Sequence, residues 1–380
     1  MAAYLDHAAS TPMRAEAIDA MAPYLRESFA NPSGGHRAAR AARRALDDAR
    51  DVVAEALGFE PGDIAFTAGG TEADNLAVAG VVGATGGTAL TSAAEHHAVL
   101  ASVERVGGLV CPVDRCGRAD LDALAALAHP GVRLVSLMLV NNEVGTVQDL
   151  EAVGDILAER APRAVLHTDA VQALTWLDVA QAARPAALVS LSAHKFGGPK
   201  GVGVLAVRAG VPLRPLLVGG GQERDRRSGT QNVAGIVAMA TAVRLTVETR
   251  AATCARVRDL RDRLVTGLSR SVEGLCCTVP PGEADVAPGI VHVCIPDVES
   301  EALLFVLEQS DVYAAAGSSC SSGAIQLSHV LAAMGVDPQL GRGALRLSLG
   351  YASTVADVDA ALATLPTAVA QLRRGAAPRR

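Results

Sequence analysis

Aromatic side chains are scarce in this chain of 380 residues: only 3% are Phe, Trp or Tyr, although 50% of the residues are hydrophobic. The core must therefore be built mainly from Ala, Val and Leu. No run of about 18 strongly apolar residues occurs, and the N-terminus MAAYLDHAAS has neither a basic leader nor an apolar signal core. We therefore expect no membrane span and a cytoplasmic protein.

The sequence also lacks an excess of positive charge and a framework of paired cysteines. The formal net charge is −6 and the isoelectric point is near 5.9, which argues against broad binding to nucleic acid or anionic membranes. The 7 cysteines are odd in number and scattered, so they do not form a disulfide framework. No Cys-x-x-Cys pair or histidine cluster has the spacing of a zinc site, and we expect no metal.

The length of the chain is too great for one simple core, so we expect one large domain and one smaller domain. From about residue 36 to 210, helical patterns alternate with short apolar runs, which is typical of a mostly parallel sheet covered by helices. After about residue 250, the pattern changes to a long Arg-rich helix, two short strands near Val279 and Ile290, and a helix around Leu303. This later region is predicted to be the smaller domain.

The alternating region contains a clear amphipathic helix and several strands. After His36, apolar residues recur at helical spacing up to Leu57, and Gly58 can end the helix. Runs rich in Val, Ile and Leu predict strands at 63–68, 132–140, 165–168, 187–191 and 202–207. Each of these runs ends in a polar cluster. Because ligands bind beyond the carboxyl ends of strands in open α/β sheets, these clusters are expected to converge on one site.

Lys195 ends the segment Ser192-Ala193-His194-Lys195, in a chain whose basic residues are mostly arginine. A lysine amine is the usual group for covalent attachment to a cofactor aldehyde. Ser192 and His194 can donate hydrogen bonds to a phosphate. The alternative for Lys195 is a solvated lysine in a surface loop.

Asp169 and the Gly69-Gly70-Thr71 segment each follow a predicted strand. A carboxylate buried at the position of Asp169 needs a cationic partner, and a protonated pyridine nitrogen would be one. The alternative is an ordinary helix N-cap. Gly70 and Thr71 lead into a helix that starts near Glu72, where free N–H groups suit a phosphate, although Thr71 is equally compatible with a routine N-cap.

Three other residues are candidates for chemistry. His96 can stack on a flat ring or transfer protons, and a purely structural histidine is the alternative. Cys320 lies in a run of small residues from 316 to 323, where we expect an exposed thiol; the alternative is an incidental cysteine in a Ser-rich linker. Arg346 sits in an apolar strand-like run and needs an anion, which can be a substrate carboxylate or a structural ion-pair partner.

Taken together, these segments resemble the cysteine desulfurases of the class V aminotransferase family, which feed sulfur to iron–sulfur cluster assembly. The resemblance spans nearly the whole chain, and its most specific parts are residues 192–195 and the loop around Cys320, which is similar to that of the subgroup with a long cysteine loop. The other matching segments are 4–12, 31–33, 66–72, 140–145 and 227–230.

The resemblance implies the α/β architecture of PLP-dependent transferases of fold type I. Expected features are a mostly parallel seven-stranded sheet in a large domain of residues 15–255, and a smaller α+β domain formed by residues 1–14 and 256–380 that carries the Cys320 loop. The implied cofactor is pyridoxal 5'-phosphate.

The resemblance also implies roles for individual residues. Lys195 would bond covalently to the cofactor, Asp169 would pair with its pyridine nitrogen, and Cys320 would receive the sulfur. His96 would stack on the ring and take part in catalysis. The other residues implied to bind the cofactor are Gly70, Thr71, Asn142, Gln172, Ser192 and His194, together with Thr230, which would reach the phosphate in the partner's site of a homodimer; Asn142 and Arg346 would hold the substrate carboxylate.

The implied reaction converts L-cysteine to L-alanine and leaves the sulfur as a persulfide on Cys320. An acceptor such as an iron–sulfur scaffold protein or a tRNA thiolation enzyme would then take the sulfur. A selenocysteine lyase or a class V aminotransferase would share Lys195 and Asp169, and a non-catalytic scaffold of the same fold is a further alternative. Cys320 is the residue that separates desulfuration from transamination.

Overall fold

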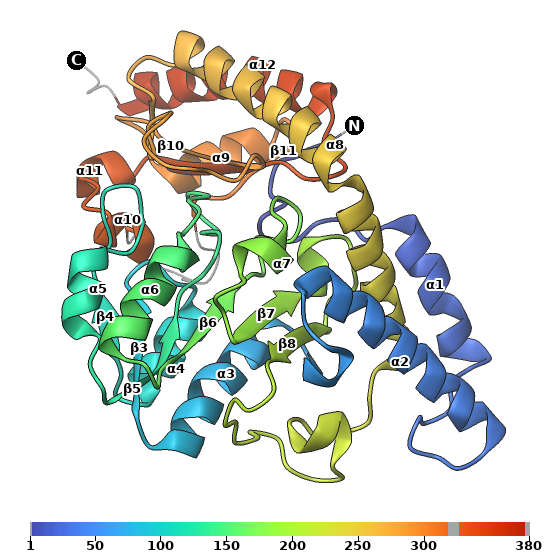
Figure 1. Ribbon diagram of the computed structural model, residues 1–380. Coiled ribbons are helices and arrows are strands. Elements are labelled where there is room, and N and C mark those ends of the chain that lie inside the picture. The colour runs from blue at the N-terminus through green and yellow to red at the C-terminus, as the bar shows by residue number, and fades with distance from the viewer. Residues whose placement is uncertain (1, 318–326, 377–380) are drawn as a thin grey trace.

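The computed structural model describes residues 2–317 and 327–376. An open sheet of seven strands lies at the centre of its larger part, in the order β2-β8-β7-β6-β5-β3-β4 (Figure 1). All neighbouring strands are parallel except β8, which is antiparallel to both β2 and β7. The prediction of a mostly parallel seven-stranded sheet is therefore confirmed. The strands are β2 (Ile64–Thr67), β3 (Thr88–Ser92), β4 (Leu109–Cys111), β5 (Val132–Ser136), β6 (Val165–Asp169), β7 (Leu188–Ser192) and β8 (Gly203–Val207).

Two details of the sheet differ from the sequence prediction. The strand predicted at 132–140 ends at Ser136, and its apolar continuation leads into a turn closed by a hydrogen bond from Gly145 N to Asn141 O (3.0 Å). Strands β3 and β4 were not predicted, because 3 of the 5 residues of β3 are Thr or Ser and β4 has only 3 residues.

Helices cover both faces of this sheet. Residues of α3 and α4 pack with Leu134 and Leu205 on one face, while α2, α6 and the first half of α8 pack with Val135 and Val204 on the other. This division follows from the two-residue period of a strand. The predicted amphipathic helix is α2, and Gly58 ends it in the left-handed conformation, as expected. The helices are α1 (Ala15–Arg26), α2 (Arg37–Leu57), α3 (Gly70–Thr85), α4 (His97–Arg105), α5 (Leu121–Leu127), α6 (Leu150–Arg160), α7 (Val179–Ala182) and α8 (Val233–Ser271), with short 3-10 turns η1 (Pro61–Asp63), η2 (Ala193–Lys195) and η3 (Gln222–Asp225).

A second core lies in the smaller part of the molecule. Antiparallel strands β12 (Ala344–Ser348), β10 (Ile290–Cys294) and β9 (Cys276–Cys277) form one sheet, and β1 (Ala3–Tyr4) pairs with β11 (Val312–Tyr313). Apolar residues of these strands pack with the second half of α8 and with two other helices into one cluster. The helices of this part are α9 (Ser300–Glu308), α10 (His329–Ala333), α11 (Pro338–Gly341) and α12 (Val355–Ala376).

Helix α8 connects the two parts, and Figure 1 shows it running from the large sheet to the smaller one. The Arg-rich helix predicted after about residue 250 is the second half of this helix, which begins at Val233. Its first turns are Ala-rich and buried, so no amphipathic stripe marks the start. Met239 belongs to the first core and Leu264 to the second. The predicted boundary between residues 255 and 256 falls inside α8 and stays a prediction.

Within residues 2–317 and 327–376, no helix is long and apolar enough to cross a membrane. The same residues hold no group of three or more His, Cys, Asp or Glu side chains arranged to bind a metal ion. Cys320, the predicted sulfur acceptor, lies outside the described residues.

Candidate active site

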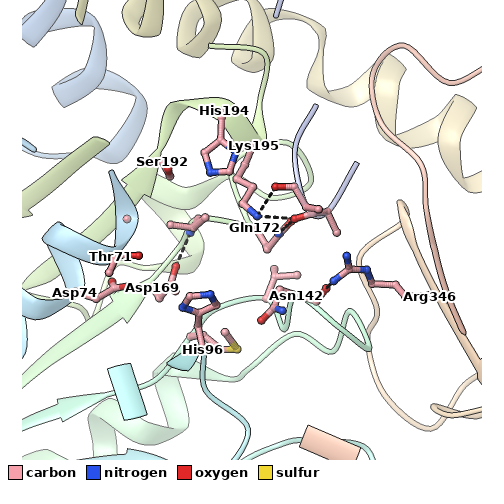
Figure 2. Close-up of a pocket in the computed structure, with 16 residues that line it drawn as sticks. Thr71, Asp74, His96, Asn142, Asp169, Gln172, Ser192, His194, Lys195 and Arg346 are labelled. Carbon is pink, nitrogen blue, oxygen red and sulfur yellow. Dashed lines mark hydrogen bonds between the residues drawn. The ribbon is translucent and has the colours of Figure 1, made fainter. Parts of the chain in front are cut away.

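A cavity of about 320 Å³ lies beyond the carboxyl ends of β5, β6 and β7. This is the expected place for a ligand in an open α/β sheet, and the volume suits a small organic molecule. In Figure 2, Thr71 and Arg346 lie on opposite sides of this cavity. The structure brings together ten residues singled out from the sequence, namely Gly70, Thr71, His96, Asn142, Asp169, Gln172, Ser192, His194, Lys195 and Arg346.

Lys195 enters the cavity from the short 3-10 turn that follows β7. Its Nζ donates hydrogen bonds to the carbonyl oxygens of Ala8 (2.6 Å) and Ala9 (3.0 Å). Gln172 Nε2 donates to the same Ala8 oxygen at 2.7 Å. The N-terminal segment therefore orients both side chains toward the ligand space (Figure 2).

Asp169 is the last residue of β6 and is only 5% exposed. Its Oδ1 accepts a hydrogen bond from Val171 N at 2.8 Å. Burial raises the pKa of Asp169, whereas His96 and Lys195 lower it. Since an isolated charge is costly at this depth, the carboxylate favours a ligand that brings a cation next to it.

His96 caps the N-terminus of α4, where its Nδ1 accepts a hydrogen bond from Ala98 N at 3.1 Å. Burial lowers the pKa of His96, and the charge of Lys195 adds to this effect while Asp169 opposes it. The ring is therefore neutral at physiological pH. Because Nδ1 accepts in this bond, the ring proton is assigned to Nε2.

One side of the cavity is rich in donors for an anion. Gly70 and Thr71 form the first turn of α3, where backbone N–H groups have no partner within the helix. Ser192 ends β7, and Nδ1 of His194 lies 3.3 Å from Ser10 Oγ. Burial, reinforced by nearby lysines, lowers the pKa of His194 to about 4. These neutral donors around a helix N-terminus suit a phosphate.

Arg346 lies in β12 on the opposite side, 2% exposed. Nη2 donates to Asp6 Oδ1 at 2.8 Å and Nη1 donates to the carbonyl oxygen of Asn142 at 3.0 Å. Among the described residues, its buried Nε has no hydrogen-bond partner. The structural ion pair considered from the sequence is thus present, and the guanidinium keeps donor capacity for a carboxylate in the cavity.

Three acidic residues near the cavity were not predicted. Asp6 was hidden because it pairs with a residue 340 positions away. Glu95 accepts hydrogen bonds from Met138 N (3.0 Å) and Ser92 Oγ (2.8 Å), and burial raises its pKa to about 8. Asp74 lines the cavity at 1% exposure, and burial, together with the charge of Asp169, raises its pKa well above the ordinary value.

The sequence did carry a signal for Asp74. It follows Thr71 by three residues and Gly70 by four, which places all three on the same face of α3. A polar residue on the helix face that meets the site was therefore recognisable from spacing alone.

Among the described residues, one predicted site residue, Thr230, is not among those that line the cavity. Thr230 is exposed in the segment of residues 219–232, which lies between β8 and α8. Cys320 lies outside the described residues.

This chain is similar to known proteins over nearly its whole length. The family model described as Aminotransferase class-V matches residues 3–361. The IscS-like cysteine desulfurase of Mycobacterium tuberculosis is 44% identical over 388 residues, covering 98% of this chain and 98% of the relative. The solved structure of a NifS-like protein aligns with a TM-score of 0.91 at 34% identity, covering 98% of this chain and 100% of that one.

A further solved structure, that of SspA in complex with cysteine, aligns with a TM-score of 0.79 at 29% identity and covers 92% of this chain and 99% of the other. The family match at residues 3–361 includes every described residue that lines the cavity. The chain belongs to the class V aminotransferase family, among its IscS- and NifS-like cysteine desulfurases.

Proposed function

We propose that this protein is a pyridoxal phosphate-dependent cysteine desulfurase that converts L-cysteine to L-alanine and collects the sulfur on Cys320. One observation supports the proposal most strongly. A lysine amine, a buried carboxylate, an arginine and a group of hydrogen-bond donors suited to a phosphate all line the same cavity. Full-length relatives that are cysteine desulfurases support the same reaction.

The residues present fit the cofactor implied by family membership. Gly70, Thr71, Ser192 and His194 offer hydrogen-bond donors for the phosphate. Lys195 offers the amine for the aldehyde. The buried carboxylate of Asp169, whose pKa is raised by burial and lowered by nearby positive charge, suits the protonated ring nitrogen. The bound cofactor would supply an electron sink for negative charge that develops on the substrate carbon.

His96 and Gln172 complete the proposed cofactor site. Figure 2 shows His96 on the opposite side of the cavity from His194 and Lys195, where its flat neutral ring can stack on an aromatic ligand. Gln172 is held by Ala8 O and would place its amide near the ring oxygen. Asn142, beside Arg346, would contribute to the same oxygen and to the substrate carboxylate.

Arg346 is proposed to bind the carboxylate of L-cysteine. Its fixed position, between Asp6 and the Asn142 carbonyl, limits the orientations open to the substrate. Lys195, released by the incoming substrate amine, would then remove the proton from Cα. His96, with its proton assigned to Nε2, is a candidate to donate or accept a proton in the following steps.

The sulfur step is proposed to be a nucleophilic attack by the Cys320 thiolate on the substrate sulfur. The new S–S bond forms as the Cβ–S bond breaks, and the bonding electron pair stays with the carbon fragment, which takes up protons to become alanine. Cys320 is left as a persulfide. No external oxidant is needed, because the two electrons that the sulfur atoms lose on forming the persulfide stay on the carbon fragment, which is reduced to alanine.

We further propose a homodimer in which Thr230 reaches the partner's site, and a protein acceptor that discharges Cys320. The exposure of Thr230 outside its own cavity is compatible with this role. An iron–sulfur scaffold protein or a tRNA thiolation enzyme fits the acceptor chemistry. The cytoplasmic location expected from the sequence stays a prediction.

Covalent trapping at the lysine tests the cofactor assignment. The protein as purified would be treated with borohydride, which reduces an imine to a stable amine, and digested for mass spectrometry. We expect the cofactor on the peptide that contains Lys195, no label in Lys195→Ala, and an unchanged label in the control Lys200→Ala. Absence of label, or label on Lys200 alone, would rule out the proposed site.

A further inference from the structure

The segment of residues 219–232 holds an unfavourable backbone conformation. Three consecutive residues that are not glycine have positive φ, namely Glu223 (49°), Arg224 (57°) and Asp225 (62°). Such angles are disfavoured for L-residues, and they persist only where surrounding contacts hold them. The segment is therefore fixed by its contacts with the rest of the chain.

The first of these contacts is a buried ion pair at Glu223, which is 5% exposed. Its carboxylate accepts hydrogen bonds from Arg50 Nη1 (2.8 Å) and Nη2 (3.1 Å), from Phe66 N (3.0 Å) and from Gln231 Nε2 (3.1 Å). Arg50 also donates to Ile64 O at 2.6 Å. Burial alone would raise the pKa of Glu223, but Arg50 holds it below the ordinary value. The ion pair thus fixes the segment to β2, just before the glycine turn.

The second contact is an ion pair at the other end of that turn. Arg227 Nε donates to Glu72 Oε1 at 2.8 Å, and Nη2 donates to Oε2 at 3.3 Å. Glu72 Oε2 also accepts a hydrogen bond from Ala68 N at 2.8 Å. One carboxylate therefore connects the first turn of α3, the start of the glycine turn and the 219–232 segment.

The turn between these two contacts has an uncommon backbone conformation that needs support from neighbouring residues. Gly69 has φ of 153° and ψ of −178°, a conformation essentially restricted to glycine. Gly70 and Thr71 follow directly and line the cavity. Anchors therefore flank the donor groups of the turn on both sides, at Phe66 and at Glu72.

We propose that Glu223, Arg227 and Glu72 are positioning residues that brace the turn of residues 68–71, and thereby set its donors for an anion. Glu223 and Arg227 do not line the cavity, so each acts through the turn. Glu72 is absent from the cavity itself and borders only the adjoining hollow beside Gly70 and Thr71, where it contacts the turn through Ala68 N. This inference rests on the proposed function for the identity of the anion as a phosphate group, and it assigns the 219–232 segment a role in this chain's own site.

Charge removal separates bracing from simple electrostatics. Glu72→Gln and Glu223→Gln each remove a negative charge near the anion site, so Coulomb attraction alone predicts tighter binding of phosphate. Bracing predicts the opposite, because the turn loses an anchor. Glu72→Gln is less disruptive to the fold than Glu223→Gln. The Glu72 side chain is partly exposed, whereas Glu223→Gln leaves the buried Arg50 without its charged partner.

The experiment measures inorganic phosphate binding to cofactor-free protein by calorimetry, with thermal stability recorded in parallel. We expect Glu72→Gln and Arg227→Met each to weaken phosphate binding by about fivefold or more, and the double variant to be no weaker than either single one. The control Arg184→Met breaks an exposed ion pair with Glu151 (3.1 Å) far from the turn and should leave the affinity unchanged.

Unchanged or tighter phosphate binding in Glu72→Gln, with the fold intact, would overturn the bracing role. Additive losses in the double variant would do the same, because independent effects do not require the ion pair. Neither outcome depends on turnover of cysteine, so failure of the bracing role is distinguishable from failure of the proposed desulfurase activity.

Discussion

Replacing Asp169 by Asn tests the electrostatic centre of the proposed site. The side chain is 5% exposed, and its Oδ1 accepts a hydrogen bond from Val171 N. Asn is nearly isosteric and its Oδ1 can accept the same bond, so the variant should fold. What it loses is the ability to carry a negative charge next to the cofactor ring nitrogen.

The expected loss follows from the burial of this charge. Leaving one partner of a buried ion pair alone costs about 3–5 kcal/mol, which corresponds to a factor of about 10² to 5 × 10³ in rate or affinity. We expect Asp169→Asn to lower the single-turnover rate of alanine formation by about that factor, measured after the variant is saturated with cofactor. A variant that retains activity within about threefold of the wild type would show that catalysis does not need the negative charge of Asp169.

Asp74→Asn is the matched control, because Asp74 is equally buried and lines the same cavity. Burial, together with the charge of Asp169, raises the pKa of Asp74 well above its ordinary value, which favours the neutral carboxyl form that Asn imitates. We expect a loss smaller than about tenfold. An equal loss in both variants would show that the assay reports general damage to the cavity.

In the cofactor-free protein, the same substitution should increase stability, although it lowers activity in the cofactor-bound protein. The folded-state pKa of Asp169 is raised, so its contribution to stability is present at low pH and is lost as pH rises above its unfolded value. At neutral pH, therefore, cofactor-free Asp169→Asn should unfold at a higher denaturant concentration than the wild type. Greater instability would contradict this expectation.

Three further predictions concern Arg346, Thr230 and His167, which is buried in β6 with its ring nitrogens against Ser136 Oγ and Ser190 Oγ. Arg346→Lys should raise KM for L-cysteine by about tenfold or more, because one ammonium replaces a two-pronged donor; an unchanged KM would exclude the proposed carboxylate contact. Burial lowers the folded pKa of His167 to about 3, so the unfolded chain takes up the proton first, and stability falls as pH drops from about 6.5 toward 3. His167→Gln should reduce the acid sensitivity of the unfolding free energy by about 1.4 kcal/mol per pH unit in that window, and parallel pH profiles would contradict it. A mixed dimer of one Thr230→Ala subunit and one Lys195→Ala subunit should recover cofactor affinity in one site, because the subunit that keeps Lys195 receives Thr230 from its partner. Cofactor affinity identical to the wild type in pure Thr230→Ala would argue against a role across the dimer.

Much of the site could be predicted from the sequence because its residues follow the strands directly. Asp169 ends β6 and Ser192 ends β7, so the parallel arrangement alone brings Lys195 and Asp169 to the same edge of the sheet. The reversed direction of β8 had no such signal, since a buried strand has the same composition in either direction.

Contacts between distant parts of the chain were beyond sequence reasoning. Asp6 meets Arg346 only because the residues after β1 lie beside β12, where Asp6 bridges to Ser348, and local pattern carries no information on that pairing. Glu223 is a similar case, since Arg50 lies 173 positions before it. Asp74 differs, because its position on the helix face that carries Thr71 was readable from spacing.

The proposed reaction needs both Lys195 and Cys320, and Cys320 decides between desulfuration and other reactions of the same cofactor. The most direct measurement incubates the protein with L-cysteine in the absence of reductant, and quantifies both alanine and the persulfide on the Cys320 peptide by mass spectrometry. We predict about one alanine for each persulfide in the first turnover, and loss of both products in Cys320→Ala, which keeps the bound cofactor. Alanine and sulfide released by Cys320→Ala at the wild-type rate would show that Cys320 does not receive the sulfur.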